Sequence, residues 1–80
     1  MNKQKLITLA EMYAEHTGLK LSTVSTYATN DGKFFASLKL QSDCTLRRAQ
    51  RVLSWFSRNW PNDLEWPSEI DRPDANEAAA

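Results

Sequence analysis

The sequence predicts an all-α domain with a body of four short helices and an extended C-terminal arm. The chain has 80 residues, which suits one small domain with a modest core. Apolar residues recur at helical spacing, and glycine, proline or capping residues mark the ends of the periodic segments. We divide the chain into a body (residues 1–60), an arm that packs on the body (61–73) and a frayed tail (74–80).

The first predicted helix carries apolar residues about 3.6 positions apart, at Leu6, Leu9, Ala10 and Tyr13. Two starts fit this pattern. Thr8 and Glu11 have the T-x-x-E form of a capping box, whereas a start near Lys3 places Thr8 inside the helix. Gly18 ends the helix, because glycine adopts the left-handed backbone conformation at low cost.

A second helix is predicted over residues 21–29. Its apolar face carries Leu21, Val24 and Ala28. The opposite face carries hydroxyl side chains, namely Ser22, Ser25, Thr26 and Thr29. A β-hairpin that pairs residues 23–28 with residues 33–38 competes with this helix, because the segment is rich in β-branched residues and Asn-Asp-Gly follows it. We prefer the helix because of its spacing from the first one.

Two further helices complete the body. Phe34, Phe35 and Leu38 fit one or two helical turns against a core. The last helix begins after Thr45, a good N-cap, and Pro61 stops it. Its apolar stripe contains Leu46, Ala49, Leu53, Phe56 and Trp60. The opposite face contains Arg47, Arg51, Ser54 and Arg58. In the arm, the apolar residues available for packing on the body are Leu64, Trp66 and Ile70.

Charge is distributed unevenly, although the formal net charge is zero. Residues 1–60 contain nine basic and four acidic side chains, a balance of +5, and residues 61–80 contain one basic and six acidic side chains, a balance of −5. A basic body attracts polyanions at long range. The alternative is that these surface charges only keep a small domain soluble.

The composition argues against several classes of function. Cys44 is the only cysteine, which excludes an internal disulfide and suggests a reducing compartment, so we expect a cytoplasmic protein. His16 is the only histidine, so the common zinc-finger spacings are absent. No glycine-rich phosphate loop, secretory signal or long apolar run occurs. We therefore expect no enzyme activity, no cofactor or metal, no small-molecule substrate and no membrane partner.

The spacing of three residues links the first two helices. Ala14 is small, so a second helix can cross close over the first. Gly18 supplies a turn with positive φ, and Val24 directs a stiff branched side chain back to the first helix. This spacing is typical of a helix-turn-helix, although it also occurs in helical hairpins that only serve folding.

The segment from Leu9 to Ser25, LAEMYAEHTGLKLSTVS, resembles the helix-turn-helix of the lactose-repressor family and, more loosely, lambda-repressor-like domains. The whole body, together with the Trp-Pro part of the arm, also resembles small uncharacterised bacterial and prophage proteins. The resemblance implies a recognition helix over residues 21–30 in the major groove of double-stranded DNA. Its implied DNA contacts are Lys20, Ser22, Thr23, Ser25, Thr26 and Thr29.

The sequence departs from the family pattern at two points. Lys20 stands where the family places a capping residue, so Ser22 is an alternative cap that would start the helix two residues later. The predicted exposed face also carries only hydroxyls, without the Arg, Asn or Gln that form bidentate bonds to base edges. The sequence therefore supports DNA binding better than strong sequence reading.

Basic residues outside the motif would supply affinity for phosphates, and we expect Lys33, Arg47, Arg48 and Arg51 to contact DNA. The arginine face of the last helix has two other readings, as a solvated surface or as the partner of the acidic arm. We predict a small transcription regulator, and a homodimer on half-sites about 34 Å apart is the natural way for it to gain affinity. Trp55 and Trp66 are suggested for the dimer surface. One alternative function is a protein-interaction adaptor that uses exposed tryptophans and the basic helix face, and another is an architectural DNA binder with little sequence preference.

Overall fold

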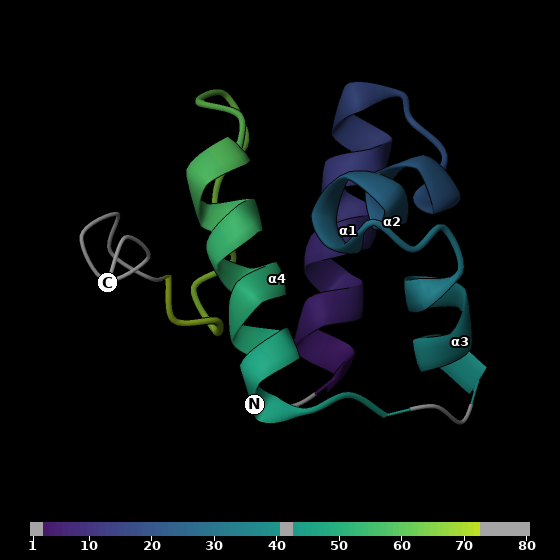
Figure 1. Ribbon diagram of the computed structural model, residues 1–80. Helices are drawn as coiled ribbons and strands as arrows, with labels where there is room; N and C mark the ends of the chain where they lie inside the picture. Colours follow the sequence, from purple (N-terminus) through teal and green to yellow (C-terminus); the bar gives the residue numbers. More distant parts are fainter. Residues whose placement is uncertain (1–2, 41–42, 73–80) are drawn as a thin grey trace.

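Four helices and no strands make up the described part of the chain, residues 3–40 and 43–72, in the computed structural model (Figure 1). The helices are α1 (Lys3–Thr17), α2 (Leu21–Thr29), α3 (Phe34–Leu40) and α4 (Leu46–Asn59). The all-α prediction is therefore confirmed, and the alternative β-hairpin over residues 23–28 and 33–38 is wrong. Asn30 ends α2 instead of opening a hairpin turn, and residues 34–38 lie in α3.

Helix α1 begins at Lys3, so the alternative start at Thr8 is wrong and Thr8 lies inside the helix. An earlier start gains a turn of helix that brings Leu6 and Ile7 into the core, where both are buried. Leu9, Ala10 and Ala14 continue the buried face toward the C-terminal end of α1.

The turn between α1 and α2 has the geometry that the spacing predicts. Gly18 has a φ of 74°, in the left-handed region where glycine avoids the steric penalty of a β-carbon. The backbone N–H of Leu19 donates to the carbonyl of Ala14 at 3.0 Å, which is the long-range bond of a Schellman motif. Ala14 and Val24 are both buried where the two helices meet. The turn thus fixes α2 across α1.

Ser25 is a correction to the sequence prediction, because its hydroxyl faces the interior. The residue is 1% exposed. Its Oγ donates to the carbonyl of Asp31 at 2.8 Å and accepts from the backbone N–H of Phe35 at 3.2 Å. The N–H of Phe35 lies in the first turn of α3, where no helical carbonyl is available to it. Ser25 therefore connects α2 to α3 and is not part of a DNA-facing surface.

Replacing Ser25 with alanine should destabilise the fold by about 1–3 kcal/mol, because a buried N–H and a carbonyl lose their partner. Thr26→Ala is the matched control, since the exposed Thr26 hydroxyl bonds only to a carbonyl of its own helix, that of Ser22. We expect the control to change the free energy of unfolding by less than about 0.5 kcal/mol. Urea titration followed by circular dichroism measures both, and equal effects would refute the structural role of Ser25.

Helix α4 completes the core with the predicted aromatic stripe. Thr45 caps it as predicted, accepting the N–H of Arg48 on its Oγ1 at 3.1 Å. Phe56 is fully buried, and Trp60 is buried at the end of the helix. Leu46 is a further correction, because it is 61% exposed. It begins α4 beside the first turn of α1, at the edge of the core.

The described part of the arm, residues 61–72, runs back along α4. Ile70 is buried in the core, and the Nε1 of Trp66 donates to the carbonyl of Ile70 at 2.7 Å. Arg72 donates to the carbonyl of Ser57 at 2.8 Å. The Nε2 of His16 lies 3.0 Å from the Oδ1 of Asp63. The arm is thereby held against both α1 and α4. The predicted tail over residues 74–80, and residue 73 of the arm, lie outside the described residues.

Candidate nucleic-acid interface

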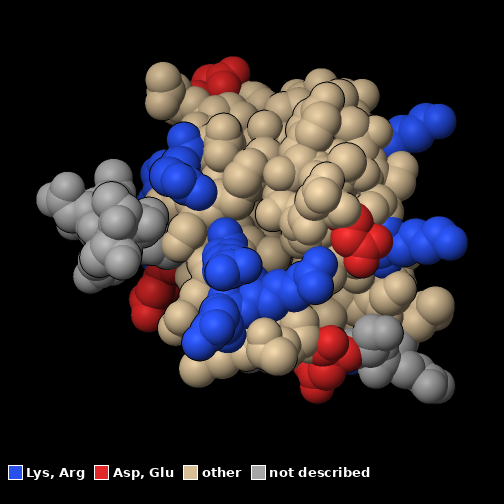
Figure 2. Space-filling view, in the orientation of Figure 1, with Lys and Arg blue, Asp and Glu red and all other residues tan. Residues whose placement is uncertain are grey.

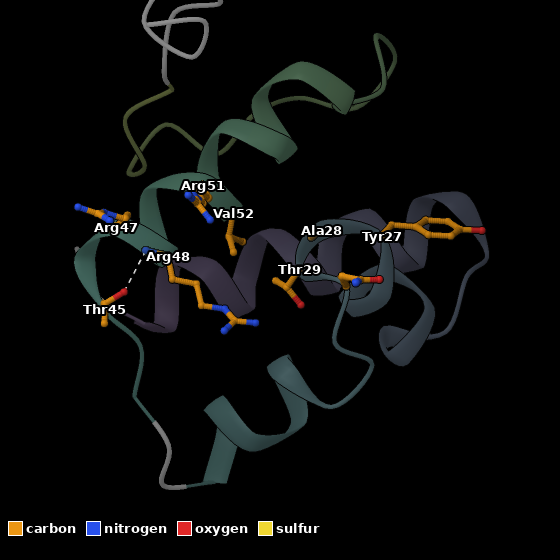
Figure 3. Close-up of a pocket in the computed structure, with 9 residues that line it drawn as sticks. Tyr27, Ala28, Thr29, Thr45, Arg47, Arg48, Arg51 and Val52 are labelled. Carbon is orange, nitrogen blue, oxygen red and sulfur yellow. Dashed lines mark hydrogen bonds between the residues drawn. The ribbon is translucent and has the colours of Figure 1, made fainter.

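A groove separates the C-terminal end of α2 from the N-terminal half of α4 (Figure 3). It has a volume of about 520 Å³. We call it the arginine groove, because α4 contributes three arginines to its lining. The residues that line it are Tyr27, Ala28, Thr29, Asn30, Thr45, Arg47, Arg48, Arg51 and Val52. The structure thus brings four predicted contact residues together, namely Thr29, Arg47, Arg48 and Arg51.

The folding of α4 explains how the arginines reach this groove. Arg47 and Arg51 are one turn apart, so they share an exposed face of the helix. The guanidinium carbon of Arg48 lies 5.0 Å from the centroid of the Phe34 ring, a cation–π contact that orients the side chain. Figure 3 shows Arg48 extending from α4 toward the end of α2 that carries Thr29.

No acidic residue lines this groove, although Asp31 and Asp43 line a neighbouring pocket together with Arg48. Arg47 and Arg48 lie in the first turn of α4, which contains no acidic residue. The helix dipole already makes this end positive, so cations here are disfavoured unless an anion binds. Lys and Arg side chains form a contiguous area over α4 in Figure 2. The site therefore concentrates positive charge at a helix N-terminus, where negative charge is normally favoured.

The acidic arm does not neutralise the groove in the described part of the structure. The ion pairs seen there join His16 to Asp63 and Lys39 to Glu11. None of the three groove arginines pairs with a carboxylate among residues 3–40 and 43–72, and no residue of 61–72 lines the groove. The alternative reading, in which the arginine face pairs with the acidic arm, gains no support from this packing.

The hydroxyl face of α2 is less available than the sequence suggests. The Oγ1 of Thr26 donates to the carbonyl of Ser22 at 3.0 Å, and that of Thr29 donates to the carbonyl of Ser25 at 2.8 Å. A β-carbon built on Gly32 would lie 3.1 Å from the Oγ1 of Thr26, so the α2–α3 loop runs close to this face. The hydroxyl protons of Thr26 and Thr29 are thus directed into the protein, leaving the oxygens mainly as acceptors.

The remaining predicted contact residues lie outside the arginine groove. Lys20 is exposed directly before α2, and Lys33 is exposed directly before α3. Lys20 occupies the N-cap position of α2 without a side-chain cap, so the later start at Ser22 is wrong. Ser22 is exposed and Thr23 is half-buried. These residues flank α2 or lie along it, while the arginines gather at its C-terminal end.

Tyr27 and Asn30 are groove residues that sequence reasoning missed. Tyr27 is 57% exposed, and Asn30 ends α2 with a left-handed φ of 60°. Positions 23, 27 and 30 are four and three residues apart, which places them on one helical face. Neither Tyr27 nor Asn30 is among the contacts that the resemblance implies, although this spacing can be read from the sequence.

The tryptophans do not present an exposed docking surface. The Trp55 ring lies 5.4 Å from Tyr13 and 5.2 Å from Phe56 between ring centroids. The Trp66 ring lies 5.0 Å from Trp60, which is buried. Trp55 and Trp66 are both half-buried. Their packing within the chain weakens the adaptor reading and the suggested dimer surface, because both depend on exposed indole rings.

Two titratable groups in the described residues have shifted pKa values, and no metal-binding cluster is found there. No cluster of three or more His, Cys, Asp or Glu side chains in that part of the chain is arranged to hold a metal ion. Burial raises the pKa of the Cys44 thiol, with the nearby Asp43 carboxylate adding to the effect, so the thiolate nucleophile is disfavoured. The hydrogen bond from His16 lowers the pKa of the exposed Asp63 carboxyl group, so this group stays ionised to lower pH than usual.

No helix in the described residues combines the length and apolar character needed to cross a membrane. A comparison of the chain with protein-family models, with curated proteins and with solved structures finds no match in any of the three.

Proposed function

We propose that this chain binds double-stranded DNA through the α1–α2 helix-turn-helix and the arginines of α4, as a small lambda-repressor-like transcription regulator. The observation that carries the proposal is the arginine groove. Three cations line it without a carboxylate partner in the described residues, and two of them stand in the first turn of a helix. A polyanion would offset the repulsion that this arrangement creates.

The helix-turn-helix geometry supports DNA as the polyanion. Gly18 fixes α2 across α1, and α2 keeps an exposed outer face next to the arginines. The major groove of B-DNA accepts one helix, while basic residues on a neighbouring element contact the flanking phosphates. In this arrangement α2 enters the groove and the arginines of α4 contact the backbone.

Binding should depend steeply on salt. Arg47, Arg48 and Arg51, together with Lys20 and Lys33, supply five phosphate contacts in the proposed complex. Five contacts give a slope of about −4 to −5 in a plot of log affinity against log salt concentration, which is roughly a 500-fold loss between about 50 and about 200 mM NaCl.

Fluorescence anisotropy with a labelled duplex of random sequence, measured over a series of NaCl concentrations, tests the proposal on the full chain. A slope near zero, or the absence of binding at the lowest salt concentration, would contradict it. A steep slope with the duplex establishes the electrostatic component without requiring knowledge of the operator.

A further inference from the structure

The outward face of α2 determines whether the protein can distinguish one base pair from another. Thr26 lies on this face but donates its hydroxyl proton to the carbonyl of Ser22. Thr29 donates to the carbonyl of Ser25, and Ser25 itself is buried. A base edge is read best by a side chain that offers a free donor and a free acceptor together. None of these three hydroxyls meets that requirement.

Asn30 does meet it. The residue is exposed, and its left-handed backbone ends α2 by donating its N–H to the carbonyl of Thr26 at 2.8 Å. Its side-chain amide makes no hydrogen bond within the described residues. The amide therefore offers both N–H donors and its carbonyl acceptor to a ligand.

The position of Asn30 links this amide to the phosphate-binding surface. Asn30 lines the arginine groove with Arg47, Arg48 and Arg51. Phosphate contacts made by these arginines would hold the C-terminal end of α2 against the duplex, because contacts to the backbone fix the register of a protein on DNA. A side chain close to these phosphate contacts is better placed to reach a base edge than a side chain at the N-terminal end of α2.

We propose that Asn30 is the specificity-determining residue of the interface and that it reads adenine. An asparagine amide pairs with adenine in a bidentate manner, donating to N7 and accepting from the N6 amino group. This inference rests on the proposed DNA-binding function. It assigns base reading to the end of α2, whereas the exposed Ser22 and Thr26 provide shape and backbone contacts.

The decisive variant is Asn30→Gly, which removes the amide and retains the left-handed backbone, because glycine adopts positive φ without strain. Alanine is a poorer choice, since its β-carbon strains the same conformation. Asn62→Ala is the matched control, because Asn62 is an exposed asparagine of the arm that does not line the groove. Thermal unfolding followed by circular dichroism verifies that both variants keep the fold.

The experiment selects bound duplexes from a random pool with the wild-type protein and with each variant. We expect the wild type and Asn62→Ala to select the same site, with adenine strongly preferred at one position of it. Asn30→Gly should lose the preference at that position alone. Its affinity for the wild-type site should fall by about 5- to 100-fold, whereas its affinity for random duplex should stay within about twofold.

The outcomes separate this inference from the function on which it rests. If Asn30→Gly selects the same bases as the wild type, Asn30 does not read the sequence, and salt-dependent binding still supports the proposed function. Salt-dependent binding by the wild type with no preferred sequence also overturns the role of Asn30 alone. If the wild type does not bind duplex DNA at low salt, both proposals fail together.

Discussion

Replacing Arg47 and Arg51 with alanine should weaken binding to duplex DNA by about 60-fold near 0.1 M salt. Each phosphate contact contributes a slope of about 0.9, so one contact changes the affinity about eightfold between about 1 M and about 0.1 M salt. The loss of two contacts, each contributing about eightfold, therefore lowers the affinity by about 60-fold. The same calculation predicts that the salt slope becomes shallower by about 2.

Arg47 and Arg51 are the informative pair because their substitution leaves the core untouched. Both are exposed on the same face of α4 and line the arginine groove. Arg48 is less suitable, since it stacks on Phe34 and its loss would also disturb packing. Anisotropy titrations at several salt concentrations give the affinity and the slope in one data set.

A control must distinguish the local effect of the groove from the effect of net charge. The double variant Lys5→Ala and Lys39→Ala also removes two positive charges, but neither residue lines the groove, and Lys39 already pairs with Glu11. We expect this control to lose less than about fivefold in affinity, because charges distant from the groove are largely screened near 0.1 M salt. Equal losses in the two double variants would show that only net charge matters and would remove the groove from the interface.

The sequence was sufficient to predict the helices because each boundary has a local physical cause. Gly18 ends α1 with a positive φ, and Thr45 caps α4 through its side chain. The segment over residues 21–29 is composed of residues that also suit a strand, yet it is helical. Its apolar residues match the helical spacing, and burial of Val24 against α1 outweighs the weak local preference.

The sequence was not sufficient to predict where the packed core stops. Periodicity defines the face of a helix that is buried, but it does not show how far along the helix other elements cover that face. Leu46 follows the stripe of α4 and is exposed, because it lies at the edge of the core beside the start of α1. Val52 lies outside the predicted stripe, yet it is buried.

The candidate site was predictable only in part for a related reason. The arginines of α4 are separated by single helical turns, so their common face follows from spacing. Their proximity to the end of α2 depends on how the helices cross, which no short-range pattern determines. The partners of Ser25 lie in the α2–α3 loop and in α3, so its burial depends on tertiary structure. The free amide of Asn30 stands out because the neighbouring hydroxyls of Thr26 and Thr29 have partners within the protein, and those hydrogen bonds cannot be read from the sequence.

The largest effect on stability is expected for Phe56→Ala. Phe56 is fully buried, and its ring contacts four other aromatic rings, those of Tyr13, Phe35, Trp55 and Trp60. Truncation of a buried phenylalanine to alanine costs about 3–5 kcal/mol, from lost transfer free energy and from the cavity that remains. Because a domain of this size has only about 3–5 kcal/mol from its core, the variant should be largely unfolded at ordinary temperature.

Leu46→Ala provides the matched control on the same helix and the same sequence stripe. Because Leu46 is 61% exposed, we expect its truncation to change the free energy of unfolding by less than about 0.5 kcal/mol. Urea unfolding followed by circular dichroism at 222 nm measures both variants. A cooperative, stable Phe56→Ala variant would contradict the assignment of Phe56 to the centre of the core. A large loss for Leu46→Ala would show that this leucine is covered in solution, most directly by a second copy of the chain, and concentration dependence of the melting temperature would then reveal that copy.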